Sequence, residues 1–210
     1  MFYDNPSLVH EMFGFITDFC IDTLKDKIHK LDIDLVELKE DMAYKHAPMI
    51  SPGMFKEFMY PHYVRLIDFL KTNSVKIVYV DCDGYPGELI PLWMEAGVDA
   101  MSPVEIAAGN DPLKLRRDYP KLGMFGGIDK RELAKTKADV YHEVVKKVPE
   151  MIEKGGFIPH VDHAIPFDVP LENYMYFREL MARLTAGETL PEPKDRPCFH
   201  DFKGKGTGGD

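Results

Sequence analysis

The segment VKIVYVDCD (residues 75–83) indicates the fold class of this 210-residue chain. Apart from Lys76, its first six residues form an apolar run, which is typical of a strand buried on both faces of a parallel sheet. Three residues that can carry chemistry, Asp81, Cys82 and Asp83, follow directly. Because side chains alternate along an extended chain, we expect Asp81 and Asp83 to point to one side and Cys82 to the other.

On both sides of this segment, short apolar runs alternate with amphipathic stretches. We predict strands at residues 33–38, 75–80, 98–101, 122–125 and 157–160. We predict helices at residues 6–31, 51–71, 88–96, 112–119, 130–154 and 170–186. The second helix should have a kink or break at Pro61, and the fifth helical region should restart after Thr136. Strands that alternate with helices favour a parallel sheet with helical crossovers.

These five β-then-α units fit two α/β architectures. One is an open doubly wound sheet, and the other is a partial (β/α)₈ barrel (TIM barrel), since a complete barrel takes about 250 residues. We assign residues 1–186 to this domain. Residues 187–210 are rich in Pro and Gly and are predicted to be a docked extension with a flexible end.

Composition excludes several classes of protein. The chain has 26 Lys+Arg against 35 Asp+Glu, a formal net charge of −9, which argues against a nucleic-acid partner. No apolar run reaches the roughly 18 residues of a membrane span, and no secretory signal is visible at the N-terminus. The three cysteines are odd in number and widely spaced. We therefore expect a globular protein of the reducing cytoplasm.

An acidic side chain follows each predicted strand. Parallel strands place their carboxyl ends at one edge of the sheet, where the active sites of such folds lie, so these side chains should come together. In strand order, they are Asp41, the pair Asp81 and Asp83, Glu105, Asp129 and Asp162.

Asp81 and Asp83 form the strongest local signal. Two carboxylates at one strand end could ligate a metal, or one of them could have a raised pKa suited to acid–base catalysis. The alternative is that they cap the following helix and contact water.

Histidines and glycines add to this edge. His163 could bind a metal or act as a general acid or base, and otherwise is a loop histidine bonded to a neighbour. His160 could point into a barrel interior or pack at a strand end. Gly126 and Gly127 would allow a ligand to approach the backbone closely, or would form a tight turn.

Four segments together resemble the uroporphyrinogen decarboxylase superfamily, over roughly residues 6–186. They are ISPGMFKEFMYPHY (residues 50–63), VDCDG with GELIPLWMEAGVDAMSPVE (residues 80–105), GGIDKREL (residues 126–133) and GGFIPHVDHAIPFDVPLENYMYFREL (residues 155–180). Members of that superfamily are (β/α)₈ barrels. The resemblance implies that this chain supplies only the later five units.

The superfamily has two main chemistries. Its decarboxylases remove acetate carboxyl groups from uroporphyrinogen in haem biosynthesis without a cofactor. Their late histidine matches His163, but their arginine-rich N-terminal signature has no counterpart here, where the first arginine is Arg65. Its cobamide-dependent methyltransferases move a methyl group between a corrinoid protein and a thiol that zinc holds. Aligned on Gly84, their zinc ligands fall on Asp81, Asp83 and His163, which implies a site for zinc or another divalent metal.

The wording of these motifs favours a methyltransferase-like enzyme of this family. In that hypothesis Asp81, Asp83 and His163 are catalytic and bind the metal, while substrate contacts come from Asp41, Glu105, Gly126, Gly127 and His160. One alternative is a uroporphyrinogen III decarboxylase, which needs no cofactor. The other is a truncated, non-catalytic subunit. The expected partners are a small-molecule substrate, a corrinoid protein, and a second copy or another chain that completes the barrel.

Overall fold

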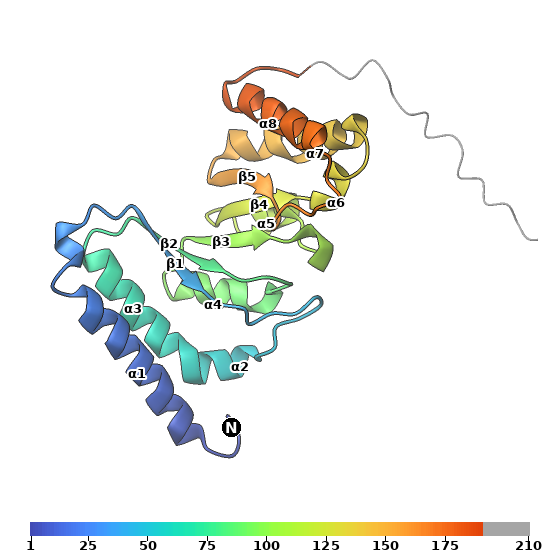
Figure 1. Ribbon diagram of the computed structural model, residues 1–210. Helices are drawn as coiled ribbons and strands as arrows, with labels where there is room; N and C mark the ends of the chain where they lie inside the picture. Colours follow the sequence, from blue (N-terminus) through green and yellow to red (C-terminus); the bar gives the residue numbers. More distant parts are fainter. Residues whose placement is uncertain (191–210) are drawn as a thin grey trace, which may run out of the picture.

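A computed structural model describes residues 1–190 of the chain, and its strands form a single five-stranded parallel sheet (Figure 1). The strands lie side by side in chain order: β1 (Leu35–Lys39), β2 (Ile77–Asp81), β3 (Ala100–Val104), β4 (Gly123–Ile128) and β5 (Phe157–Val161). All five predicted strands are present, and every neighbouring pair is parallel. The α/β fold of a partial barrel is confirmed. The predicted extension at residues 187–210 lies largely outside the described residues.

Helices connect the strands. They are α1 (Pro6–Leu24), α2 (Pro52–Met54), α3 (Tyr60–Thr72), α4 (Ile90–Glu95), α5 (Pro112–Asp118), α6 (Lys130–Leu133), α7 (Lys137–Lys154) and α8 (Leu171–Thr185). Short 3₁₀ turns lie at Ile28–Lys30 (η1), Gly87–Leu89 (η3) and Ile106–Ala108 (η4), and a π-helical turn, η2, lies at Phe55–Met59. Five of these helices have a polar N-cap residue whose side chain accepts a hydrogen bond from an N–H group of the first turn. These residues are Asn5, Ser51, Asp111, Asp129 and Thr136.

Two helix predictions need correction or refinement. The first helix ends at Leu24 rather than near residue 31, because the three charged residues that follow are exposed and buried Ile28 turns into the core through η1. The break predicted at Pro61 is confirmed as a π turn. Pro61 has no N–H to donate, and the N–H of Tyr60 reaches back five residues to the carbonyl of Phe55.

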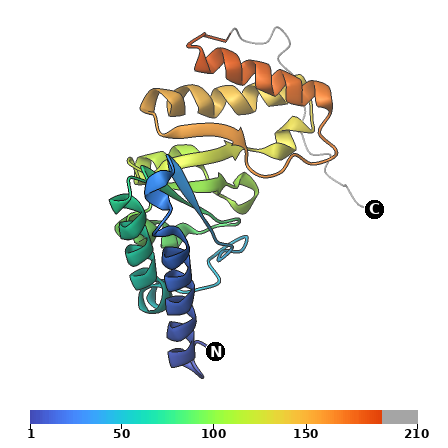
Figure 2. The same ribbon diagram turned by 60° about the vertical axis from the view of Figure 1, so that its left-hand side comes forward.

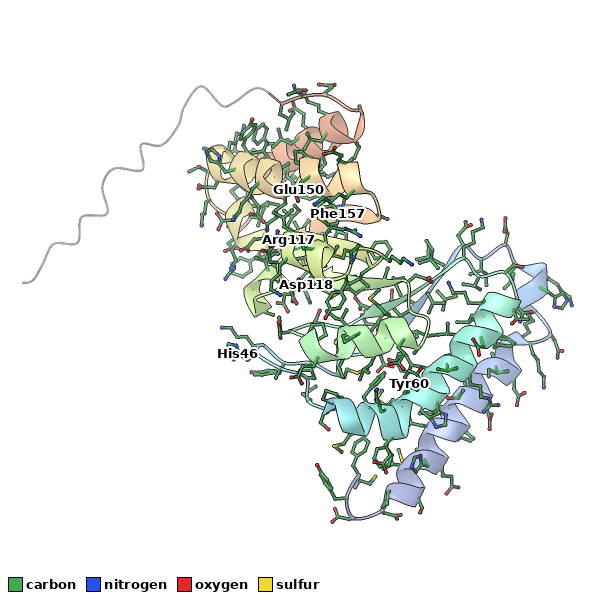
Figure 3. The ribbon with its side chains drawn as sticks, turned by 180° about the vertical axis from the view of Figure 1, so that it is seen from behind. His46, Tyr60, Arg117, Asp118, Glu150 and Phe157 are labelled. Carbon is green, nitrogen blue, oxygen red and sulfur yellow. The ribbon has the colours of Figure 1, made fainter. Side chains whose placement is uncertain are left out.

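The core has two parts. The larger part packs α1, α3 and α4 against β1–β3, and includes the fully buried side chain of Trp93. The smaller part packs α7 and α8 against β4 and β5, at the opposite end of the sheet (Figure 2). Phe157 contacts both parts, and Figure 3 shows it between the sheet and the helices of the second part. One aromatic side chain on β5 therefore links the two packing units.

The other face of the sheet carries exposed apolar side chains. Leu35 lies opposite Ile77 in the register, and they are 47% and 40% exposed. Phe125, whose ring centroid is 4.9 Å from that of Tyr79, lies opposite Ile158, which is 57% exposed. In a closed barrel this face would line the interior, so the sheet described here has the form of an open half-barrel.

Candidate active site

The carboxyl ends of β2 and β5 bring together two of the predicted site residues. Nε2 of His163 lies 3.2 Å from Oδ2 of Asp83, although the residues are 80 positions apart in the sequence. Their side chains are 46% and 45% exposed, so both can reach a bound molecule. A carboxylate beside an imidazole can orient the ring, stabilise its charged form and support proton transfer.

The third predicted catalytic residue, Asp81, makes its contact with a different side chain. Its carboxylate bonds to Nζ of Lys39, directly opposite on β1. Cys82 points the other way, into the core, as the alternation predicts. Burial raises the pKa of the Cys82 thiol to about 11, so this cysteine stays protonated and is a poor nucleophile.

The backbone at Asp83 and Gly84 is held by side chains from the neighbouring loops. Oδ1 of Asp41 accepts a long hydrogen bond from the N–H of Asp83 at 3.4 Å, and Oε2 of Glu105 accepts one from the N–H of Gly84 at 2.9 Å. Nδ2 of Asn110 donates to the carbonyls of Gly84 and Glu105, at 2.8 and 2.9 Å. Asp41 and Glu105 thus position the loop after β2 that carries Asp83.

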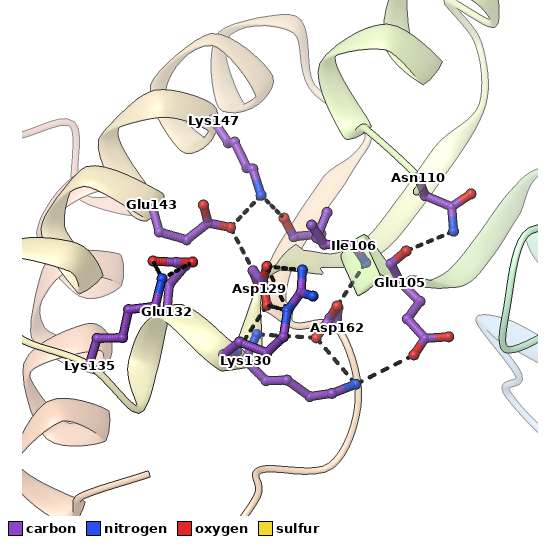
Figure 4. Close-up of polar contacts among 12 residues, drawn as sticks. Glu105, Ile106, Asn110, Asp129, Lys130, Glu132, Lys135, Glu143, Lys147 and Asp162 are labelled. Atoms are coloured by element: carbon purple, nitrogen blue, oxygen red, sulfur yellow. Dashed lines mark hydrogen bonds and ion pairs between the residues drawn. The ribbon is translucent and has the colours of Figure 1, made fainter. Parts of the chain in front are cut away.

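Asp162 is the most buried acidic residue of the site and ties three strand ends together (Figure 4). Its carboxylate is fully buried. Oδ2 accepts the N–H of Ile106, after β3, at 2.7 Å, and Oδ1 accepts the N–H of Lys130, after β4, at 3.2 Å. Nζ of Lys130 lies 3.6 Å from both Asp162 and Glu105. Because His163 is the next residue, this network fixes the backbone that presents the imidazole.

A second polar network stands behind the first one. The carboxylate of Asp129 accepts hydrogen bonds from the backbone N–H, Nε and Nη2 of Arg131. Burial alone would raise the pKa of Asp129, but these hydrogen bonds outweigh it and hold the pKa below its usual value. Glu143 accepts the N–H of Asp129 at 2.7 Å and pairs with Lys147, whose Nζ donates to the carbonyl of Gly127. The loop after β4 is therefore braced from α7.

The glycines and the second histidine have contacts within the protein. Gly126 and Gly127 have positive φ angles of 99° and 78°. A Cβ on Gly126 would lie 3.0 Å from the backbone N of Val104, and one on Gly127 would lie 3.3 Å from Pro112. The ring of His160 contacts the carbonyl of Val161. Positive φ angles and close packing within the protein account for both glycines, and their predicted contact with substrate stays a prediction.

Asp83 also lines a pocket of about 430 Å³. Its wall includes the carboxylates of Asp83 and Glu105 and the cationic side chains of Lys45 and Arg131. The volume lies within the usual range for small-molecule sites. Both charge signs line it, so it suits a charged, polar ligand better than an apolar one.

The predicted three-ligand metal set does not fit this geometry. Asp83 and His163 converge, but Asp81 is engaged by Lys39. Within residues 1–190, no three or more His, Cys, Asp or Glu side chains gather in a way that could hold a metal ion. Of the three predicted ligands, a metal here would find only Asp83 and His163 together.

The sequence pattern identifies Asp162 only as one of the strand-end carboxylates, and it does not identify Lys130, Arg131 or Asn110 as functional. Lys130 and Arg131 directly follow the Asp129 cap, and Asp162 precedes His163, so their places at strand ends were visible. Their partners were not visible, because each bonds to a loop that follows a different strand. Those loops come together only when the register of the sheet is known.

The sequence model described as uroporphyrinogen decarboxylase (URO-D) matches residues 1–184. This chain belongs to the uroporphyrinogen decarboxylase family. It is 25% identical over 190 residues to a uroporphyrinogen decarboxylase of Campylobacter concisus (strain 13826), covering 89% of this chain and 52% of that protein. It is 25% identical over 181 residues to a uroporphyrinogen decarboxylase of Sulfurimonas denitrificans (strain ATCC 33889 / DSM 1251), covering 84% and 49%.

The chain thus spans about half the length of the curated relatives that it matches. The family resemblance and the partial barrel expected from the sequence are both confirmed by the match and the sheet. Across residues 1–190, none of the helices has the length and apolar character that a bilayer crossing requires.

Proposed function

We propose that this chain carries the proton-transfer site of a decarboxylase that acts on a carboxylate-bearing substrate of the uroporphyrinogen type. The observation that carries the proposal is the Asp83–His163 pair, 3.2 Å apart. Asp83 also lines a pocket together with the cationic residues Lys45 and Arg131. The names of the relatives support the same reaction class.

The two side chains have different roles in this reaction. Protonated His163 gives its proton to a ring carbon of the substrate, and the carboxylate of Asp83 stabilises the resulting cation. The bond between the side-chain methylene and its carboxylate then breaks, its electron pair enters the ring system, and CO₂ leaves. A proton from solvent adds to the methylene carbon, and the ring proton returns to His163. The net change is replacement of a carboxylate by hydrogen.

The test is anaerobic incubation of the purified chain with uroporphyrinogen, with CO₂ and the less carboxylated products measured. Asp83→Asn and His163→Gln should each lower turnover about 100-fold or more, because positioned acid–base groups contribute on that scale. Asp68→Asn and His142→Gln, at exposed positions on α3 and α7, are the matched controls. No CO₂ from the parent chain, or equal turnover in all four variants, contradicts the proposal.

Methyl transfer between a corrinoid protein and a thiol is the second candidate. It is favoured by one specific observation: two of the three positions that match the zinc ligands of the family's methyltransferases, Asp83 and His163, come within hydrogen-bonding distance. Metal analysis of the parent protein and of Asp83→Ala tests it. One equivalent of zinc in the parent that is lost in the variant favours this candidate, whereas CO₂ release without bound metal favours decarboxylation.

Association with a second copy or another chain stays a prediction. The exposed apolar face of the half-barrel and the two edge strands, β1 and β5, are consistent with it. Light scattering of the purified protein distinguishes a 24.0 kDa monomer from a larger assembly.

A further inference from the structure

Arg131 is held in one orientation by the residue that caps its own helix. Its Nε donates to Oδ1 of Asp129 at 2.9 Å, its Nη2 donates to Oδ2 at 2.6 Å, and its backbone N–H donates to Oδ1 at 2.9 Å. The Asp129 carboxylate is only 7% exposed. An arginine side chain normally loses much conformational freedom on binding a ligand, and this pairing removes part of that cost in advance.

Only one edge of the Arg131 guanidinium is used by Asp129. The paired edge is the one formed by Nε and Nη2, while within residues 1–190 Nη1 makes no hydrogen bond and the end formed by Nη1 and Nη2 stays open. The side chain is 58% exposed and lines the 430 Å³ pocket. A guanidinium end of this kind matches the two oxygens of a carboxylate.

Lys45 supplies a second cation to the same pocket. It lies on the loop after β1 and lines the pocket. This loop is joined to the loop after β2 by the hydrogen bond from the N–H of Tyr85 to the carbonyl of Tyr44, at 2.9 Å. Among the described side chains Lys45 has no ion-pair partner. The carboxylate of Glu105 in the pocket wall is offset by Lys130, 3.6 Å away, so an incoming anion is not opposed by a bare negative charge there.

We propose that Arg131, assisted by Lys45, binds a carboxylate of the substrate that is not lost in the reaction. The inference rests on the proposed function and specifies its substrate further, because the site would then select molecules with at least two carboxylates. A cation on the departing carboxylate would stabilise the ground state and oppose loss of CO₂. Arg131 therefore suits a retained carboxylate, while Asp83 and His163 serve the reacting centre.

Calorimetric titration of the full chain with the butane-1,2,3,4-tetracarboxylate anion, at fixed ionic strength, tests the inference without any turnover. Arg131→Lys keeps the charge and the Asp129 pair but removes the open guanidinium end, so it should weaken binding about tenfold; Arg131→Ala should weaken it at least as much. Arg178→Ala, at an exposed arginine on α8, is the matched control and should leave the affinity within about twofold. Circular dichroism of each variant verifies folding.

Three results would overturn the inference: no tetracarboxylate binding by the parent, equal affinity in the Arg131→Lys and Arg178→Ala proteins, or binding of inorganic phosphate in place of the tetracarboxylate. Failure of the proposed function looks different. It would leave tetracarboxylate binding intact and dependent on Arg131, with no CO₂ released from uroporphyrinogen. If the proposed function and this inference are both correct, Arg131→Lys should raise KM for uroporphyrinogen and leave kcat nearly unchanged.

Discussion

Replacement of Asp162 by asparagine should destabilise the protein strongly, although the two side chains have nearly the same shape. The Asp162 carboxylate is fully buried and each oxygen accepts one backbone N–H, from Ile106 at 2.7 Å and from Lys130 at 3.2 Å. An asparagine can satisfy only one of these donors with its oxygen. Its NH₂ group would face the other donor.

The magnitude follows from these contacts. One hydrogen bond to a charged acceptor is lost, worth about 1.5–3 kcal/mol, and one buried backbone N–H is left without an acceptor. The Lys130 ammonium also loses one of its two carboxylate neighbours, both 3.6 Å away. We expect the free energy of unfolding to fall by about 2–4 kcal/mol.

Urea denaturation followed by circular dichroism measures this change. Asp68→Asn, at an exposed position on α3, is the control and should change the unfolding free energy by less than about 0.5 kcal/mol. A loss below about 1 kcal/mol in Asp162→Asn would refute the view that this carboxylate holds the strand ends together.

Three further predictions concern other positions. Gly84→Ala should lower the free energy of unfolding by about 2–4 kcal/mol, because φ is 81° and a Cβ would lie 2.7 Å from a backbone oxygen. Gly109→Ala, at φ 92° with nothing within 4 Å, should lower it by only about 1 kcal/mol in the same denaturation assay. Burial raises the pKa of Glu40 above its usual value of 4.5, so the folded state binds this proton more tightly than the unfolded state does. The free energy of unfolding should therefore fall as pH rises from 4.5 through the raised pKa. Glu40→Gln should flatten that part of the pH profile of stability, and an unchanged profile would contradict the assignment. In native protein at pH 8, iodoacetamide should label half-buried Cys20 well before Cys82, whose pKa is about 11. Mass spectrometry of the digested protein measures the order of labelling, and labelling of Cys82 before Cys20 would contradict the prediction.

Hydrophobic pattern predicted the strands because each one is a compact apolar run between turn residues. The pattern predicts that two strands end too early, at residues 101 and 125. In the structure β3 continues through Pro103 to Val104, and β4 continues through Gly126 and Gly127 to Ile128. Proline and glycine normally mark the end of a strand. Here the neighbouring strands supply backbone pairing that local sequence cannot reveal, and the positive φ angles of the two glycines are held by packing.

The site was only partly predictable for a related reason. Topology alone indicated that Asp83 and His163 would lie near one edge, and the structure places them 3.2 Å apart. The contact of Asp81 with Lys39 was not predictable, because Lys39 is a cross-strand neighbour set by the β1–β2 register. The same limit applies to Asp162, whose partners follow β3 and β4.

The agreement of strand order with chain order has a consequence for folding. Each strand pairs only with the strand before it and the strand after it, so the unit formed by one strand and its helix interacts mainly with its nearest neighbours, as repeats do in a solenoid. The paired residues are still far apart in sequence, from 21 positions between Tyr79 and Ala100 to 42 positions between Leu35 and Ile77, so each pairing must first close a crossover connection. Amide protons should therefore exchange most slowly in β2–β4 and progressively faster toward β1 and β5, where opening one terminal unit breaks a single interface.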